Sequence, residues 1–518
     1  MGVSMLWVSD SIAGQAPPVP VDQPAVAIGA ETPLTWAEFR DREIAYASAL
    51  QRAGVRPGDR VGMLLKNSVD YMIAIFAIAR VGAIAVRLNW RLMPNELKFI
   101  LNDSGTTLLL LDHDLAGKVA DIRADLPVRT YVVRGDATLD WAQPFEDFVA
   151  GPLSMEFPEL NLDDPACLMY TSGTTGLPKG AIWTHGNNLW FGAIQSLRWK
   201  FDSSTVAMTS GPLFHAGGWE ALLLSAITSH GTAITYPSGS FDLLEYLAAC
   251  RTQQVTDILI YSFMVPEFIR RPDCAELIPP TLRRIVCGGD TLMPWVYDEF
   301  AKKLPHIELV QVYGLTEGGA ITCCLDGKDA DRAGSVGRTM PFTDVRIVTG
   351  EGKDAPVGEV AELYVRSPAV SPGYWHRDEA NAETFVDGWC RTGDLASVDS
   401  EGFITLGGRA KDMIRSGGEN IYPAEIEAVI TTAPGVADAA VVGVPDPRYN
   451  EVGCAVLVAM DGQQVDVDAV RAFCVARLAK YKVPKYLVVV DELPRTASGK
   501  IKKFELREKY RDLGEPAS

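Results

Sequence analysis

The sequence predicts an α/β protein with a large N-terminal domain of doubly wound sheets, a small antiparallel β subdomain, and a small α+β C-terminal domain. Helix and strand patterns alternate through the first 150 residues and resume near residue 165, which implies parallel sheets covered by helices on both faces. Between residues 345 and 406 the helical period gives way to short alternating segments, which predict antiparallel strands. A length of 518 residues and an ordinary globular composition allow several cores.

The N-terminal region carries clear helix-start and strand signals. Thr35 and Glu38 have the spacing of a capping box and open a helix. We expect this helix to bury Trp36 and Phe39, and Ser68 is placed to cap the next helix. Strands are predicted at residues 60–65, 84–88 and 107–111.

Strand patterns in the second part of this domain end at two loops of interest. Strands are predicted at residues 166–170, 257–261, 284–286 and 308–313. Ligands of parallel sheets bind at the carboxyl ends of the strands. The loops that begin at Thr171 and Gly314 each follow a strand in this way, so both are candidates for a binding site.

A change of pattern predicts a domain boundary near residue 409, giving domains at residues 1–408 and 409–518. In the second domain we expect a helix opening at Pro423, strands at 441–444 and 455–459, and a helix at 467–478. This unit of about 110 residues is within the usual range for a domain.

The charge distribution argues against a nucleic-acid partner and suggests a polyanionic small substrate. The net charge of −18 argues against nonspecific binding of nucleic acid. Basic and acidic residues balance in 409–518, so the negative charge lies in 1–408. The end of the chain is basic and suits a polyanionic small substrate, with Lys480, Lys482, Lys485, Arg495, Lys500, Lys502 and Lys503.

The cysteines and the apolar runs favour a cytoplasmic protein. The nine cysteines contain no CxxC pair, so neither a disulfide framework nor a zinc site is indicated. The N-terminus lacks the pattern of a signal peptide, and the apolar run at 72–86 is too short to span a membrane. A longer run at 218–237 contains Glu220 and His230.

The strongest chemical signal is the run YTSGTTGLPKG at residues 170–180. Its glycines allow backbone N–H groups to form an anion nest, its hydroxyls add donors, and Lys179 adds a positive charge. These features suit a polyphosphate. The run is not a Walker A loop, because Pro178 precedes the lysine and Gly180 follows it.

This run resembles the phosphate loop of the acyl-adenylate-forming superfamily, which includes acyl-CoA synthetases, 4-coumarate:CoA ligases, beetle luciferases and the adenylation domains of peptide synthetases. Further motifs follow in the family's order: YGLTE at 313–317, WCRTGDL at 389–395, SGGENIYP at 416–423 and PRTASGK at 494–500. The resemblance covers nearly the whole chain and implies that the C-terminal domain is mobile.

The resemblance implies an ATP site. Asp394 would accept hydrogen bonds from both ribose hydroxyls, and Arg409 would contact the ribose or the α-phosphate. Thr171 and Glu317 would bind Mg²⁺, because a carboxylate is a hard oxygen ligand for a metal that bridges phosphates. The implied ATP- or AMP-binding residues are Thr171, Ser172, Gly173, Thr174, Thr175, Gly176, Lys179, Gly288, Gly289, Asp290, Tyr313, Gly314, Thr316, Asp394, Arg409 and Lys500.

The resemblance also implies two catalytic conformations. Lys500 would neutralise the charge that builds when a carboxylate attacks the α-phosphate, an effect typically worth roughly 3 to 4 kcal/mol per donor. After rotation about a hinge at Lys411, a second loop would line the CoA tunnel for thioester formation. The implied catalytic residues are Lys500, Thr316, Glu317 and His215, and the CoA loop is Ser416, Gly417 and Gly418.

Several features separate the branches of the superfamily. His215 stands where peptide-synthetase domains carry the aspartate that pairs an α-amino group, so an amino acid would lose its ion pair. No feature supports a luciferin pocket. Lys500 and Glu317 are both present, which argues against a non-catalytic acyl-adenylate binding protein. Transfer of the acyl group to a carrier protein instead of CoA stays open.

The acyl pocket implied by the resemblance comprises His215, Gly218, Trp219, Gly314 and Gly318. The spacing of His215 and Trp219 is that of long-chain fatty acyl-CoA synthetases, in which the tryptophan gates the acyl tunnel; a core indole is the equally weighted alternative. Gly217, Gly218, Gly318 and Gly319 are expected to leave space around the tryptophan. Residues 214–221 contain no basic residue to pair a second carboxylate. We therefore expect a monocarboxylic acid with an apolar body, fatty or aryl-substituted.

The sequence thus predicts an ATP-dependent, AMP-forming acyl-CoA ligase. It would activate a carboxylic acid as acyl-AMP with release of pyrophosphate and then transfer the acyl group to CoA. Mg²⁺ is the expected cofactor, and the carboxylic acid, ATP and CoA are the expected partners. No nucleic acid and no transmembrane segment are expected, while peripheral membrane contact and a homodimer are compatible with the sequence.

Overall fold

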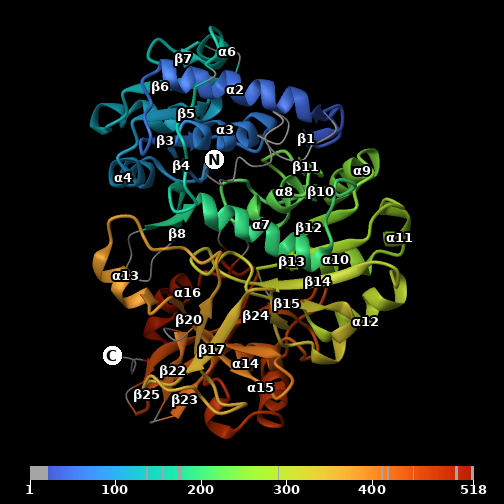
Figure 1. Cartoon of the computed structure of the whole chain (residues 1–518). Helices are drawn as coiled ribbons and strands as arrows, with labels where there is room; N and C mark the ends of the chain where they lie inside the picture. Colours follow the sequence, from blue (N-terminus) through green and yellow to red (C-terminus); the bar gives the residue numbers. More distant parts are fainter. Residues whose placement is uncertain are drawn as a thin grey trace.

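Two large sheets of mainly parallel strands form the N-terminal part of the structure (Figure 1). The structure is a computed structural model that describes residues 21–135, 138–154, 156–171, 178–289, 291–409, 412–416, 419–446, 448–495 and 500–514. The seven-stranded sheet occupies the upper part of the view, and the C-terminal sheet lies at the bottom. The predicted α/β class and the sequence of sheets along the chain are confirmed.

The seven-stranded sheet has the order β7-β6-β5-β3-β4-β8-β9, and all its strand pairs are parallel except β8 with β9. Its strands are β3 (Arg60–Leu64), β4 (Ile84–Arg87), β5 (Leu108–Asp112), β6 (Thr130–Arg134), β7 (Gln143–Pro144), β8 (Pro165–Thr171) and β9 (Lys179–Thr184). Helices of this part of the chain are α2 (Trp36–Arg52), α3 (Val69–Arg80), α4 (Pro94–Ser104), α5 (Gly117–Ala120) and α6 (Phe145–Val149), with 3-10 turns at His113–Leu115 and Arg123–Asp125.

The nine-stranded sheet has the order β16-β15-β14-β13-β12-β10-β11-β1-β2. Its strands are β1 (Pro24–Ile28), β2 (Leu34–Thr35), β10 (Val206–Thr209), β11 (Thr232–Thr235), β12 (Asp257–Tyr261), β13 (Arg284–Gly288), β14 (Glu308–Tyr313), β15 (Cys323–Asp326) and β16 (Arg338–Thr339). The associated helices are α7 (His185–Trp199), α8 (Ser225–Thr228), α9 (Leu243–Thr252), α10 (Met264–Arg270), α11 (Cys274–Leu277) and α12 (Pro294–Lys303), with a π-helical turn at Glu220–Leu224 and a 3-10 helix at Gly327–Arg332.

Strand β1 joins the nine-stranded sheet although the whole seven-stranded sheet follows it in sequence. It pairs in parallel with β11, and Figure 1 shows the two strands side by side. One apolar cluster takes buried side chains from α2, α3 and α7 and from strands of both sheets. The helices between the sheets therefore join them into one core, which brings the carboxyl ends of strands from both sheets together.

Two smaller sheets complete the fold. The antiparallel sheet contains β17 (Asp344–Val348), β18 (Ala361–Arg366), β19 (Phe385–Val386), β20 (Trp389–Val398) and β21 (Ile404–Arg409), with α13 (Asp378–Thr384) nearby in sequence. The C-terminal sheet contains β22 (Ile414–Ser416), β23 (Glu419–Ile421), β24 (Val436–Asp446), β25 (Asn450–Ala459) and β26 (Tyr486–Val490). Its helices are α14 (Pro423–Ile430), α15 (Val467–Val475) and α16 (Lys503–Lys509), with 3-10 turns at Lys480–Lys482 and Arg511–Gly514. The chain changes sheet between Arg409 and Ile414.

The predicted helix caps are confirmed. The hydroxyl of Thr35 accepts from the N–H of Glu38 at 3.2 Å, and the Glu38 carboxylate accepts from the N–H of Thr35 at 2.8 Å. The hydroxyl of Ser68 accepts from the N–H of Tyr71 at 3.1 Å. Trp36 and Phe39 are fully buried, as expected.

The helix predicted at 467–478 is shorter than expected. It ends at Val475, because the N–H groups of Arg477 and Leu478 both bond to the carbonyl of Cys474 in a tight turn. Within the described ranges, no helix combines the length and the apolar character needed to cross a bilayer.

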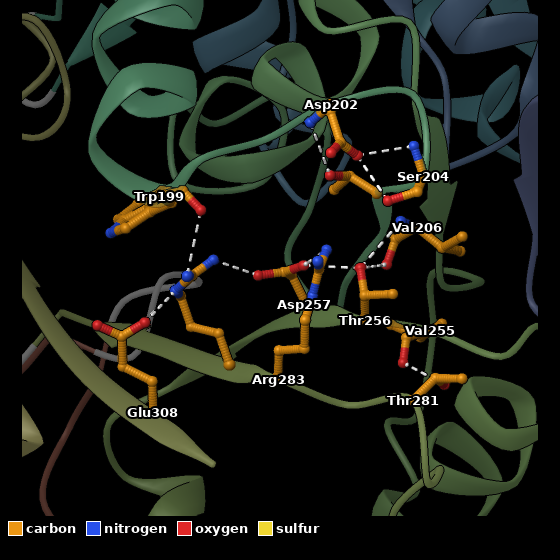
Figure 2. A network of polar contacts seen from close by, with 12 residues as sticks. Trp199, Asp202, Ser204, Val206, Val255, Thr256, Asp257, Thr281, Arg283 and Glu308 are labelled. Atoms are coloured by element: carbon orange, nitrogen blue, oxygen red, sulfur yellow. Dashed lines mark hydrogen bonds and ion pairs between the residues drawn. The ribbon is translucent and has the colours of Figure 1, made fainter. Parts of the chain in front are cut away.

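A buried polar network anchors the end of α7 to the amino ends of the central strands (Figure 2). Asp257, at the start of β12, is fully buried and forms an ion pair with Arg284 of β13. Arg284 also bonds to Glu308 of β14 at 2.8 Å and donates to the carbonyl of Trp199 at 3.2 Å. This network lies at the opposite end of the strands from Tyr261, Gly288 and Tyr313.

Candidate functional site

The end of β8 meets the loop that follows β14, although the two strands belong to different sheets. The hydroxyl of Thr171, the last residue of β8, donates to Oε1 of Glu317 at 2.9 Å. The indole N–H of Trp183 donates to the carbonyl of Thr316 at 3.0 Å. The site therefore places Thr171, Thr316 and Glu317 together, at the carboxyl ends of their strands.

Tyr374 also contacts Glu317, and the sequence did not predict it as a site residue. Its buried phenol donates to Oε1 of Glu317 at 3.0 Å, and the ammonium of Lys179 lies 5.3 Å from the centre of its ring. No spacing pattern points to this tyrosine, because its partners are brought to it only by the pairing of distant segments. Tyr374 links the lysine of the phosphate loop to the carboxylate of Glu317.

The base of the phosphate loop is held at both ends. Thr171 of β8 pairs with Lys179 of β9 in the antiparallel register. The Tyr170 phenol donates to Asp103 at 2.8 Å, and Asp103 forms an ion pair with Arg377. Ser172, Gly173, Thr174, Thr175 and Gly176 of the predicted nucleotide site lie outside the described residues.

A second cluster gathers at the predicted ribose position. Asp394 of β20 forms an ion pair with Arg409 of β21 and accepts a hydrogen bond from the phenol of Tyr313. The N–H of Asp394 donates to the hydroxyl of Thr392 at 3.0 Å. Burial raises the pKa of Tyr313, and the charge of Asp394 raises it further, so the phenol stays protonated and donates. Three predicted nucleotide residues thus form one polar group.

Glycines shape the backbone beside this cluster. A Cβ at Gly314 would lie 2.0 Å from the carbonyl oxygen of Ala320, so the turn after β14 closes only on a glycine. Gly288 ends β13 beside β14, and Gly289 has φ +100°, a conformation that favours glycine. Asp290 lies outside the described residues.

His215 lies on a tight loop after β10. Its Nδ1 accepts from the N–H of Gly217 at 3.0 Å. Burial lowers the pKa of His215 to about 4, with further contributions from the positive charges of Lys500 and Arg87. The imidazole is therefore neutral near pH 7, with its proton on Nε2, since Nδ1 is an acceptor.

Other atoms lie where a Cβ of two predicted acyl-pocket glycines would be. A Cβ at Gly218 would lie 1.9 Å from the carbonyl oxygen of Pro212, and one at Gly318 would lie 2.5 Å from the side chain of Leu315. The Cβ directions of these two glycines therefore do not face open space, and their place in an acyl pocket stays a prediction. Trp219 is fully buried, and its ring meets that of Phe76 edge-on at 6.1 Å between centroids.

Tyr261, at the carboxyl end of β12, is a further polar group at the site that the sequence did not indicate. Its hydroxyl is buried and has no hydrogen-bond partner among the described residues. A Cβ at Gly211 would lie 3.3 Å from this oxygen, which places Tyr261 against the His215 loop. Burial raises the pKa of Tyr261 to about 12, and Arg91 opposes the shift.

The C-terminal part contributes Lys500, whose charge reaches the imidazole of His215. Ser416 ends β22 and pairs with Asn450 of β25. Gly417 and Gly418 of the predicted CoA loop, and Lys411 of the predicted hinge, lie outside the described residues.

The basic end of the chain is largely balanced by acids, contrary to the expectation of a cationic patch. Acidic partners neutralise most of the lysines and arginines counted in the sequence, so the local charge alone does not indicate a polyanion. The ion pairs are Lys482–Glu425, Lys485–Asp446, Arg495–Asp438, Lys502–Glu505 and Lys503–Glu427.

The family model for the AMP-binding enzymes matches the chain at residues 14–375. The model for the AMP-binding enzyme C-terminal domain matches it at residues 425–500. The chain belongs to the AMP-binding enzyme family, as its phosphate loop, Asp394 cluster and sheet order together indicate. Its acyl-adenylate-forming character, expected from the motifs, is confirmed.

Relatives of known activity are similar over almost the whole chain. A feruloyl-CoA synthase of Amycolatopsis sp is 40% identical over 92% of this chain and 94% of its own length. A long-chain-fatty-acid–CoA ligase, FadD13, of Mycobacterium tuberculosis is 35% identical over 92% and 93%. The crystal structure of the anthranilate CoA ligase AuaEII in complex with anthranoyl-AMP superposes with a TM-score of 0.89, at 25% identity, covering 98% of this chain and 97% of that one. The protein is an ATP-dependent acyl-CoA ligase, an acid–thiol ligase that forms AMP.

Proposed function

We propose that this ligase activates a monocarboxylic acid whose body is largely apolar, either fatty or aryl-substituted. The observation that carries this proposal is the charge state of the His215 loop. Arg87 is the cation that reaches this loop from the seven-stranded sheet, and it is already paired with Glu220. Because both charges are satisfied by each other, neither is available to pair a second carboxylate or an amino group of the substrate.

The hydroxyl of Tyr261 favours an aryl acid over a plain alkyl chain. A buried hydroxyl without a partner costs free energy, typically ~1 to 3 kcal/mol. A substrate with a polar substituent on its ring would supply the missing partner. An aryl body with one polar substituent therefore fits this side of the site better than a fatty acid does.

The reaction follows from the positions of the polar residues. Asp394 and Arg409 would hold the ribose, and Gly288, Gly289 and Tyr313 would border the adenine. A carboxylate oxygen of the acid attacks the α-phosphorus of ATP, and the bond to pyrophosphate breaks. Lys500 stabilises the charge that develops on the transferring oxygens. The thiol of CoA then attacks the acyl carbonyl carbon, and AMP leaves.

The residues at the phosphate loop fit Mg²⁺. Glu317 and Thr171 offer a carboxylate and a hydroxyl 2.9 Å apart, which are oxygen donors of the kind that Mg²⁺ prefers. Among the described residues no group of three His, Cys, Asp or Glu side chains forms a metal cage. One protein carboxylate together with substrate phosphates is a common arrangement for Mg²⁺. When bound, the ion would neutralise charge on the phosphates.

We further propose two domains, 1–408 and 409–518, that rotate about a hinge near Lys411 for the CoA step. The change of sheet between Arg409 and Ile414 supports a boundary close to this one, although Arg409 itself is still the last residue of β21. Rotation would bring the loop of Ser416, Gly417 and Gly418 to the site.

The alternative acceptor of the acyl group is a carrier protein instead of CoA. A thioester assay in which CoA is the only acceptor tests this alternative, and saturable formation of acyl-CoA supports the proposal.

We propose that the enzyme acts in a reducing cytoplasm. All nine cysteines are buried and free, and burial raises the pKa of most of them, for example that of Cys167 to about 12. Thiols of this kind are unreactive. Retention of all nine as free thiols after purification without reductant would be consistent with this.

A panel of acids in a pyrophosphate-release assay tests the substrate class. It contains ferulate, cinnamate, the even fatty acids from hexanoate to dodecanoate, a dicarboxylate and an amino acid. We expect ferulate to exceed cinnamate in kcat/KM, and Tyr261→Phe to remove that difference.

Along the alkyl series each added CH₂ should raise kcat/KM about three- to fourfold until the pocket is full, because burying one methylene contributes ~0.8 kcal/mol. A dicarboxylate or an amino acid as best substrate would overturn the proposal.

The same panel tests whether Trp219 limits the pocket. Trp219→Ala is expected to shift the optimum toward longer acids. Phe76→Ala is the matched control, because it removes the ring that packs on Trp219 within the same core cluster. Equal shifts in both variants would mean that Trp219 acts only as a core residue.

A further inference from the structure

The loop that carries His215 is held by side chains from the other sheet. Asn67, which follows β3, donates from Nδ2 to the carbonyl of Gly211 at 3.0 Å and accepts from the N–H of Leu213 at 2.9 Å. Arg87, the last residue of β4, donates from Nη2 to the carbonyl of Leu213 at 2.5 Å. The backbone just before His215 is therefore fixed from the seven-stranded sheet.

Arg87 also holds the far end of the loop. Its Nη1 forms an ion pair with Oε1 of Glu220, and its Nη2 lies 3.1 Å from Oε2. The Arg87 side chain is 1% exposed and that of Glu220 is not exposed at all. The amide of Gln195 on α7 donates to the carbonyl of Glu220 at 3.0 Å. One guanidinium thus spans both ends of the segment that contains His215.

The segment does not hold its shape through regular secondary structure. Ala221 and Leu222 have non-helical angles inside the π-helical turn, and Leu222 has φ +154°. Gly218 is folded tightly against the carbonyl of Pro212. A backbone of this kind keeps its conformation only where its surroundings determine it.

A buried ion pair is a weak source of stability. Removing two charges from water costs several kcal/mol per ion, and apolar replacements are often neutral or stabilising. Burial raises the pKa of Glu220, and Arg87 opposes this shift. Stability alone therefore does not explain the Arg87–Glu220 pair. Its geometry, which reaches both ends of the His215 loop, needs a separate explanation.

We propose that Arg87, through Glu220 and the carbonyl of Leu213, is a positioning residue that sets the orientation of His215 for the carboxylic acid. This inference rests on the function proposed above. A displaced loop would turn the neutral imidazole of His215 away from the place where its Nε2–H can meet the acid, whereas the nucleotide cluster of Asp394 and Arg409 lies on other strands and would not move.

Arg87→Lys is the informative variant. It keeps the charge, but an ammonium cannot reach both oxygens of Glu220 and the carbonyl of Leu213 in a planar fork. We expect kcat/KM for ferulate or octanoate, whichever the wild type uses faster, to fall 10- to 100-fold in acid-dependent ATP–pyrophosphate exchange. The KM for ATP should stay within twofold.

Arg284→Lys is the matched control. Arg284 is likewise an almost buried arginine, 11% exposed, that bridges acids on neighbouring strands, but it lies at the amino end of β13. We expect this variant to lose thermal stability comparably and to keep kcat/KM within twofold. Equal kinetic effects in both variants would show that Arg87 acts only on stability.

A second readout separates this inference from the proposed function. In NMR spectra of protein labelled at histidine, the His215 resonance is assigned by its loss in His215→Asn. The chemical shift of this resonance should change in Arg87→Lys and stay the same in Arg284→Lys. An unmoved resonance in both variants overturns the inference even if every acid is adenylated. Absence of acid-dependent exchange in the wild type overturns the proposed function, and the spectra still decide the position of the ring.

A double variant keeps the test valid if Arg87→Lys does not fold. Arg87→Met with Glu220→Leu removes both charges and preserves volume, so no unpaired charge is buried. It lacks the bond to Leu213, and we expect the same loss in kcat/KM for the acid. Wild-type kinetics in a folded double variant would overturn the inference.

Discussion

Lys500 and His215 lie nearly 300 residues apart in the sequence, and the charge of Lys500 acts on the imidazole of His215. The positive charge of Lys500 is one of the causes that lower the pKa of His215, after burial. An electrostatic effect of this kind is what the proposed role of Lys500 beside the carboxylate requires.

Lys500→Ala should abolish adenylation and spare the second half reaction. We expect acid-dependent pyrophosphate release to fall about 10²- to 10³-fold, as for loss of one preorganised donor. Thioester formation from preformed acyl-adenylate should stay within threefold, because the lysine serves the first conformation only. Lys502→Ala is the control, since Lys502 is nearby in sequence and is paired with Glu505 at 2.8 Å. Equal losses in both half reactions would contradict this role.

At the scale of elements, local signals in the sequence predicted the structure well. The capping box of Thr35 and the cap of Ser68 depend on neighbours three residues away, and both formed. Strands β12 and β14 have the predicted bounds, because their apolar runs are short and sharply bounded. Signals of this kind need no knowledge of the tertiary structure.

Features that depend on distant partners could not be predicted. Nothing in the sequence of β1 indicates that it pairs with β11 rather than with the strands that follow it. Tyr374 and Tyr261 became recognisable only when their partners, or the lack of them, were visible. The glycines near His215 were correctly noted, but the carbonyl of Pro212 fills the space at Gly218.

The network at the amino ends of the strands should contribute to stability and not to catalysis. Asp257→Ala would leave Arg284 without its buried partner, and breaking such a pair typically costs roughly 3 to 5 kcal/mol. Urea denaturation followed by tryptophan fluorescence measures the loss. Asp344→Ala is the control, because its pair with Arg366 is exposed, and exposed pairs contribute about 0 to 1 kcal/mol. A similar loss in both variants would refute the anchoring role.

The segment between β21 and β22 should control the second half reaction. Lys411→Pro fixes φ near −65° and would prevent the backbone change that a hinge must absorb. We expect adenylation within threefold of the wild type and a more than tenfold loss in single-turnover thioester formation. Lys411→Ala keeps the backbone freedom and should behave like the wild type. Normal thioester formation by the proline variant would place the hinge elsewhere.

At the scale of the whole molecule, the layer of helices that joins the two sheets buries a histidine, and this should lower the stability of the fold in acid. The layer contains α7, whose first residue, His185, is fully buried. Burial lowers the pKa of His185 to about 4, and Asp164 opposes the shift. His215 has the same depressed value. The folded protein therefore holds two histidines neutral at a pH where the unfolded chain would protonate them.

The free energy of unfolding should fall as the pH falls from about 6.5 to 4. In this window the unfolded chain binds more protons than the folded protein, so acid favours unfolding. For His185 a shift from about 6.5 to about 4 corresponds to roughly 3 kcal/mol. Denaturant unfolding at several pH values measures the slope. His185→Gln should reduce this loss by about that amount, and His306→Gln, a substitution at an exposed position, is the control. If both variants keep the wild-type slope, the buried imidazole in the helix layer is not what limits stability in acid.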